Sequence, residues 1–297
     1  MTSVIEPLPF RLLIDEAMRL TRRHFRQMYL PVALPVALAQ ALVPVAQALI
    51  FGGGFFTAAP DPASMIAGMA GFFGLVFVTG AVWGLGYGAL LVAATEAQTD
   101  AGVSMARAWL TMVRPRVLGT SVLVALALLV GCALCLLPGV FVALAFSLVV
   151  PVMAAERIYG TTALARAVAL VRQNPGGQFV THPMLKVFLI LVIGYVLSSV
   201  VGLVIQMPFV IAQQVIVFRS AAEGQTTDPM QLMTTMTLLQ LPASVLNALA
   251  TTVVQLYLSF ALALFYFDLR RRQEGGDLES AIQEMAGRPP DAPPAAG

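Results

Sequence analysis

The chain has 297 residues, of which 59% are hydrophobic and only 11% are charged. Soluble domains carry about 25% charged and about 45–50% apolar residues, so this composition cannot cover a water-exposed surface. The formal net charge of +2 is too small for the long-range attraction that draws proteins to nucleic acid. The sequence therefore predicts an integral membrane protein whose main partner is the lipid bilayer, with no nucleic-acid partner.

Long apolar runs follow one another along the chain. A transmembrane helix needs about 20 apolar residues to cross a hydrocarbon core about 30 Å thick. The runs that reach this length are residues 29–56, 65–95, 117–136, 139–155, 183–218 and 230–267. Leu137, Pro138 and Gly139 predict a tight turn between the third and fourth runs. Pro208 and Pro242 predict a break inside each of the two longest runs.

A short basic segment precedes each pair of runs. The first covers residues 9–28, the second contains Arg107 and Arg114, and the third contains Arg166 and Arg172. Basic amphipathic helices lie in the headgroup plane and attract anionic lipid. The sequence therefore predicts an all-α fold of three transmembrane hairpins, each preceded by a basic amphipathic helix, with anionic lipid headgroups as partners.

The distribution of Lys and Arg predicts the orientation. With six spans, sixteen of the 17 basic residues fall on one side of the membrane. They are Arg11, Arg19, Arg22, Arg23, Arg26, Arg107, Arg114, Arg116, Arg157, Arg166, Arg172, Lys186, Arg270, Arg271, Arg272 and Arg288. Cytoplasmic loops carry the excess of basic residues, so both ends of the chain are expected in the cytoplasm.

Three regions are expected along the chain. Residues 1–28 form a cytoplasmic amphipathic helix, residues 29–268 form the six-helix transmembrane domain, and residues 269–297 form a cytoplasmic tail. The tail is charged at first and then rich in Pro and Ala, a composition that buries too little apolar surface to fold. Its last part is therefore expected to be disordered.

Small residues spaced by four form a stripe on two of the predicted helices. They are Gly80, Gly84 and Gly88 in the second run, and Gly194, Ser198 and Gly202 in the fifth. Such stripes let two helix backbones approach closely. We interpret them as internal packing positions, and a homodimer face or a lipid groove is the alternative.

Uncharged amides are the main polar groups inside the runs. Gln40 and Gln47 lie in the first run, seven residues apart and hence on one helix face, and Asn247 and Gln255 lie in the sixth. Gln206, Gln213 and Gln214 lie in the fifth. Hydrogen bonds between the amides would hold helices together. The alternative is a polar path for a substrate.

The sequence contains no pattern typical of an active site. It has no nucleophile beside a base, no carboxylate pair and no clustered metal ligands, so we expect a non-enzyme without cofactor or metal. Cys132 and Cys135 have the CxxC spacing of thiol redox sites. We interpret them as small apolar residues in a membrane helix, with a redox or metal role as the alternative.

Two stretches resemble a known family. The first comprises Leu137-Pro138-Gly139, Ser147, Val150-Pro151-Val152, Glu156, Gly160, Ala163-Leu164, Arg166 and Val171-Arg172, and the second covers residues 265–279 with Asp268 and Arg270. Together they resemble the bacterial six-span membrane domain of some glycerophosphodiester phosphodiesterases and the stand-alone YciC-like membrane proteins. This resemblance implies a location in the bacterial cytoplasmic membrane. Without the phosphodiesterase barrel, it implies no hydrolase activity.

Two hypotheses for the function follow. The first is a non-catalytic protein that scaffolds a protein partner, forms a homo-oligomer, or organises lipid through its basic helices. Its candidate residues are Arg107, Arg114, Glu156, Arg166, Arg172, Asp268 and Arg270, and we expect Glu156 to pair with Arg166 because an unpaired carboxylate at a bilayer boundary is costly. The second is a transporter or lipid-handling protein. A cavity lined by the amides would favour the second hypothesis, and a closed, glycine-packed bundle would favour the first.

Overall fold

The computed structural model describes residues 9–52, 62–98, 102–134, 136–172, 182–222 and 229–286, which are helical almost throughout. The helices are α1 (Phe10–Met28), α2 (Leu30–Gly52), α3 (Pro62–Glu96), α4 (Met105–Val113), α5 (Pro115–Leu134), α6 (Leu136–Phe146), α7 (Val149–Glu156), α8 (Thr161–Arg172), α9 (Pro183–Ala222) and α10 (Pro229–Ala286). Within these residues, six segments have the length and composition to cross a membrane, namely Leu30–Gln47, Ile66–Glu96, Pro115–Leu134, Gly139–Glu156, Pro183–Arg219 and Thr234–Gln273. The expected all-helical, six-span class is confirmed, and the chain is a multi-pass membrane protein.

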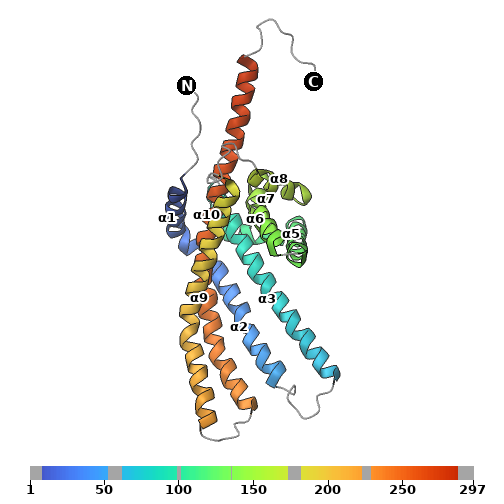
Figure 1. The fold of residues 1–297 in the computed structure, drawn as a ribbon, viewed down its shortest axis with the longest axis vertical. Helices are drawn as coiled ribbons and strands as arrows, with labels where there is room; N and C mark the ends of the chain where they lie inside the picture. The colour runs from blue at the N-terminus through green and yellow to red at the C-terminus, as the bar shows by residue number, and fades with distance from the viewer. Residues whose placement is uncertain are drawn as a thin grey trace.

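Four long helices make up the body of the molecule. Helices α2, α3, α9 and α10 run lengthwise together, and α4 to α8 gather beside one end of them (Figure 1). Helix α10 packs against α1, α2, α3 and α9. The amphipathic helices α1, α4 and α8 precede the three helical hairpins, as the basic segments of the sequence predict.

The packed core lies at the end of the bundle where α1 and α4 to α8 gather. Tyr266, Phe260 and Phe265 of α10 are fully buried there, together with Met28 and Leu90. The rest of the bundle is looser, because most large apolar side chains in the first half of α3 and along α9 are exposed. Exposed apolar side chains are expected where a helix faces lipid.

The two predicted proline breaks are wrong. Pro208 lies within α9 and Pro242 within α10, and both helices continue through them. Proline is tolerated in membrane helices because neighbouring helices, hydroxyl side chains and small local adjustments satisfy the backbone groups that it frees. The two longest runs therefore form single helices of 40 and 58 residues.

The turn predicted at residues 137–139 is also misplaced. Helix α5 ends at Leu134 and α6 begins at Leu136, so Pro138 falls in the first turn of α6, where a missing N–H breaks no helical hydrogen bond. The fourth span is instead interrupted between α6 and α7. Pro151 has no N–H to donate to the carbonyl of Ser147, and the Ser147 hydroxyl donates to the carbonyl oxygen of Leu144 at 2.8 Å.

The transmembrane domain was expected to end at residue 268, but helix α10 does not end there. It continues to Ala286 and projects beyond the other helices (Figure 1). Its 58 residues correspond to about 87 Å at 1.5 Å per residue, which is far more than a hydrocarbon core of about 30 Å. The charged part of the predicted tail is therefore helical as far as residue 286. The Pro- and Ala-rich end, which was expected to be disordered, lies outside the described residues.

Candidate functional site

A groove lined by polar side chains runs along the loosely packed part of the bundle. One cavity of about 270 Å³ lies between α2, α9 and α10, one of about 240 Å³ between α2, α3, α9 and α10, and one of about 600 Å³ along α9 and α10. The cavities adjoin one another. Gln40 lines the first and second, Asn247 lines the second and third, and Gln206 lines the first and third.

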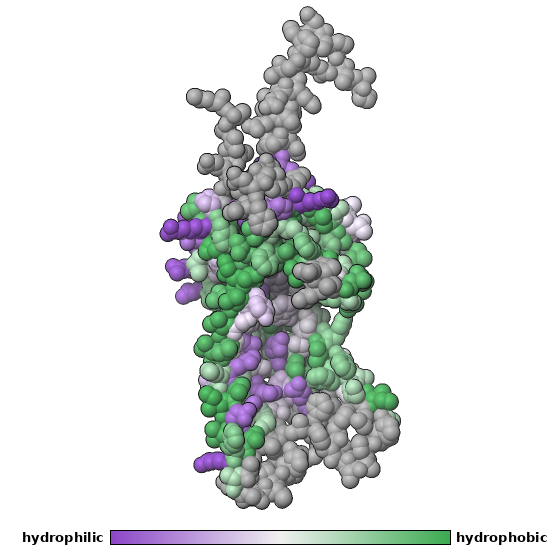
Figure 2. Space-filling view, viewed as in Figure 1, coloured by the Kyte–Doolittle hydropathy of each residue, from purple (hydrophilic) through white to green (hydrophobic). Residues whose placement is uncertain are grey.

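Seven amide side chains line this groove, and all of them lie within candidate membrane spans. They are Gln40 and Gln47 of α2, Gln206 and Gln213 of α9, and Gln240, Asn247 and Gln255 of α10. Figure 2 shows hydrophilic side chains gathered along the middle of the long bundle, with hydrophobic ones on both sides. The structure therefore brings together six of the seven amides that the sequence analysis named. It leaves out Gln214 and adds Gln240.

One amide joins two helices, because the Gln213 Nε2 donates to the Met236 carbonyl oxygen of α10 at 3.5 Å, but the amides of α2 and α10 do not bind one another. Among the described residues, no hydrogen bond joins Gln40 or Gln47 to Asn247 or Gln255. The Asn247 Oδ1 and the Ser198 Oγ are buried without a hydrogen-bond partner. A buried polar atom without a partner costs about 1–3 kcal/mol, and both residues line the cavities.

The glycine stripes have different surroundings along their length. Gly80 and Gly84 are exposed, and a Cβ atom added at either would meet nothing within 4 Å. The expectation that these two positions pack inside the bundle is wrong, although the neighbouring Thr79 is buried against α2, where its hydroxyl donates to the Ala39 carbonyl oxygen at 3.4 Å. A Cβ at Gly88 would lie 2.9 Å from the Met112 sulfur, so this glycine does sit at a helix contact.

The second stripe lies against α10. A Cβ at Gly194 would lie 2.7 Å from the Leu258 Cγ, and one at Gly202 would lie 3.1 Å from the Asn247 Oδ1. Ser198 lines two of the cavities. The absence of bulk at these positions allows α9 to approach α10, and it also leaves room beside Asn247 in the groove.

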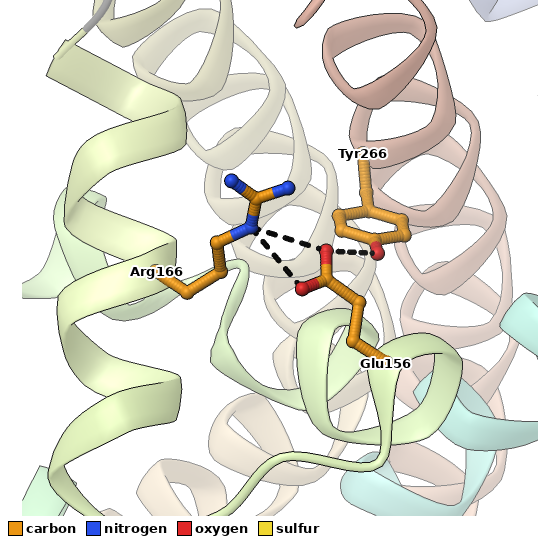
Figure 3. Close-up of polar contacts among 3 residues, drawn as sticks. All are labelled: Glu156, Arg166 and Tyr266. Carbon is orange, nitrogen blue, oxygen red and sulfur yellow. Dashed lines mark hydrogen bonds and ion pairs between the residues drawn. The ribbon is translucent and has the colours of Figure 1, made fainter. Parts of the chain in front are cut away.

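At the packed end, Glu156 accepts hydrogen bonds from two side chains (Figure 3). The Arg166 Nε lies 3.1 Å from Oε2 and 3.3 Å from Oε1, and the Tyr266 hydroxyl donates to Oε1 at 2.9 Å. The structure thus contains the predicted Glu156 and Arg166 pair. It also adds Tyr266, which ties α7 and α8 to α10 across 110 residues of sequence.

Backbone geometry at the end of α7 brings these side chains together. Arg157 has a φ of 56° and Gly160 a φ of 69°, both in the left-handed region. These two residues reverse the chain direction, so that α8 returns past the end of α7. The Gly160 N–H donates to the Thr120 Oγ1 at 2.8 Å, which anchors the turn to α5. Neither Thr120 nor Tyr266 could be found from sequence spacing.

A second ion pair lies nearby on α10, where Asp268 pairs with Arg272 one turn later. Lys186 of α9 lies close enough to interact electrostatically with both side chains. Arg270 lies beside the Tyr266 hydroxyl. The spacing of four between Asp268 and Arg272 is visible in the sequence, whereas the approach of Lys186 is not.

The remaining candidate arginines point outward. Arg107, Arg114 and Arg172 are exposed on or beside α4 and α8. Ser104 caps α4 by accepting a hydrogen bond from the Arg107 N–H at 3.5 Å. Outward-pointing arginines on amphipathic helices can reach lipid phosphates, but the structure does not bring them together into one site.

The described part of the chain contains few residues that could support thiol or metal chemistry. Cys132 is a free thiol, exposed on α5, and Cys135 lies outside the described residues. Within the described ranges, no group of three or more His, Cys, Asp or Glu side chains lies close enough to hold a metal ion.

The chain matches no family model, and it matches neither a curated protein nor a solved structure.

Proposed function

We propose that this multi-pass membrane protein handles a lipid or another amphiphile by binding its polar part in the groove between α2, α9 and α10. The observation that carries this proposal is the set of seven amides that line a cavity within membrane-length segments. Gln40 is ten residues into its span, about 15 Å along the helix, so it lies near the middle of a hydrocarbon core about 30 Å thick. Polar groups at that depth are costly unless they have partners.

The shape of the groove supports a ligand that enters from the membrane. Leu203, Met207 and Val210 border the largest cavity and are exposed. They would be in contact with acyl chains while the amides hold a polar group. A closed bundle, which would favour a purely structural scaffold, is at odds with the three adjoining cavities.

Binding of anionic lipid by the basic helices is a second candidate function, compatible with the first. The exposed arginines of α1, α4 and α8 favour it. We also propose that the protein is not an enzyme, that both termini are cytoplasmic, and that it belongs with the bacterial YciC-like membrane proteins that it resembles. The basic residues concentrated on one side support the orientation.

The proposal is tested by photo-crosslinking in native membranes. Benzoylphenylalanine is placed at Gln206 in the groove and, as a matched control, at Leu129, which is 66% exposed on α5. Intact-mass spectra after irradiation report which lipids attach at each position. We expect the Gln206 adducts to be enriched in one lipid class relative to the Leu129 adducts, because only the groove selects its ligand. Adducts of equal composition at both positions would contradict a binding groove.

A further inference from the structure

The chemistry of the groove indicates which class of ligand it takes. Among the described residues that line the three cavities, none is charged. The polar side chains are amides and hydroxyls, and Ser198, Ser244 and Thr251 accompany the seven amides. A phosphate or an ammonium group would therefore enter a membrane-embedded cavity without a counter-ion. The cost of an unpaired charge at low dielectric is high, so the lining disfavours ionic headgroups.

The amides recur at one spacing on three helices. Gln40 and Gln47 on α2, Gln206 and Gln213 on α9, and Gln240 and Asn247 on α10 are each seven residues apart. Seven residues correspond to about two turns and about 10.5 Å of helix, so each helix presents two amides on one face. The groove thus offers paired amides over a length that suits an extended headgroup rather than a single ion or water molecule.

Amides both donate and accept hydrogen bonds, and so do hydroxyl groups. A phosphate oxygen only accepts, and an ammonium group only donates. A ligand with many hydroxyls is therefore the best complement to a lining of amides and hydroxyls. The partnerless Asn247 Oδ1 requires a donor, which a sugar hydroxyl supplies without bringing a charge into the groove.

Aromatic and apolar residues complete the lining. Trp83 borders the second cavity beside Gln40 and Gln255, and Tyr195 borders the third. The residue Trp83 is 42% exposed. One face of its ring stacks on Tyr87, with the centroids 6.0 Å apart, and the other face is left for the C–H face of a sugar ring. The third cavity, of about 600 Å³, falls within the range of small-molecule sites, which is roughly 300–1,000 Å³, and the two smaller cavities adjoin it.

We infer that the groove binds the uncharged, hydroxyl-bearing headgroup of a glycolipid, with the acyl chains lying along the exposed apolar face of α9. This inference rests on the proposed function, because it names the ligand class of the same groove. The same hydroxyl chemistry could be supplied by a free sugar. The experiment therefore includes both sources.

The test is native mass spectrometry of the full-length protein in lipid nanodiscs. The probes are glucosyl-diacylglycerol, phosphatidylglycerol and phosphatidylethanolamine with identical acyl chains, and free glucose as the soluble arm. We expect the glucosyl lipid to bind at least about ten-fold more tightly than either phospholipid. Gln40→Leu and Gln206→Leu should each weaken it roughly five-fold, as expected for one lost hydrogen bond. Leucine has a similar size and suits a membrane helix, so both variants should still insert.

Gln214→Leu is the matched control, because Gln214 is an exposed neighbour of Gln213 that does not line the groove. It should leave binding unchanged. If phosphatidylglycerol bound as tightly as the glucosyl lipid or more tightly, and if Gln206→Leu weakened that binding, the inference of a glycolipid would be overturned. The groove would still be a lipid site. If glucose alone displaced the glycolipid, the groove would bind a free sugar, and the inference that its ligand is a lipid would be overturned. If no probe responds to the Gln40 or Gln206 variants, the proposed function fails as well.

Discussion

Replacing Glu156 by glutamine is expected to destabilise the fold by about 2 kcal/mol, because Arg166 loses its counter-ion. Breaking a fully buried ion pair costs about 3–5 kcal/mol, whereas an exposed pair contributes about 0–1 kcal/mol. The Arg166 and Glu156 side chains are 29% and 16% exposed, so this pair falls between the two limits. The effect should appear without loss of membrane insertion, since the pair joins helix ends rather than spans.

Tyr266→Phe separates the hydrogen bond from the packing of the ring. It removes the donor to the Glu156 Oε1 and keeps the buried aromatic ring, so we expect a loss of about 1.5 kcal/mol, the low end for a hydrogen bond to a charged group. Glu156→Gln and Tyr266→Phe should not be additive, because they act on one contact. The double variant should be about 0.5–1 kcal/mol more stable than the sum of the single losses predicts.

The measurement is thermal unfolding of the purified proteins in one detergent. For a chain of this size, 1 kcal/mol corresponds to roughly 2–4 °C, so Glu156→Gln should lower the midpoint by about 4–8 °C. The matched control is Glu16→Gln. Glu16 contacts Arg19 at 2.7 Å, but these side chains are 35% and 76% exposed, and the shift should be small. If Glu16→Gln lowered the midpoint as much as Glu156→Gln, burial would not explain the stability of the pair.

Two further predictions follow from packing and orientation. Gly194→Ile should lower the free energy of unfolding by about 1–3 kcal/mol through overpacking against Leu258. Gly84→Ile should change it little, because nothing lies near that position. Thermal unfolding compares the two variants, and equal losses would contradict the open surroundings of Gly84. A cysteine introduced at Gln273, in a protein in which Cys132 and Cys135 are replaced by serine, should resist an impermeant thiol reagent in intact cells and react in inside-out vesicles. Labelling of this cysteine from outside the cell would show that the C-terminal end is not cytoplasmic.

The spans could be predicted from the sequence because uncharged length is sufficient to define them. The three basic segments and the charged tail leave little choice for the helices between them, and all six runs overlap the candidate spans. The interruptions could not be predicted in the same way. Proline ends helices in water, yet Pro208 and Pro242 lie within continuous helices. The chain is instead interrupted before Pro151, where the Ser147 side chain bonds back to the preceding turn.

Part of the hydrogen-bonded group around Glu156 could be predicted from the sequence. Glu156 and Arg166 are close along the chain, so a reversal between two helices was enough to predict their pairing. Tyr266 lies 110 residues away, and only the packing of α7 on α10 brings it near. Gly80 and Gly84 show the opposite error. A stripe of small residues permits a close helix contact, but it does not determine whether a partner helix extends that far.

The position of the amides follows from the same division between a packed and a loose half of the bundle. A helix face that repeats an amide every seven residues drifts by only about 20° per repeat, so the amides of α2, α9 and α10 keep to one side of each helix. That side cannot face acyl chains without leaving polar groups unpaired. The three helices turn their amides towards a common groove, in which Gln206 and Gln240 remain exposed. In the packed half, large apolar side chains such as Phe260 and Phe265 fill the corresponding space. In the loose half the space is left as cavities, and Ser198 and Asn247 carry buried polar atoms there without partners. A bundle built only for stability would close this half with leucine. The amide lining therefore supports the ligand that we propose for this groove.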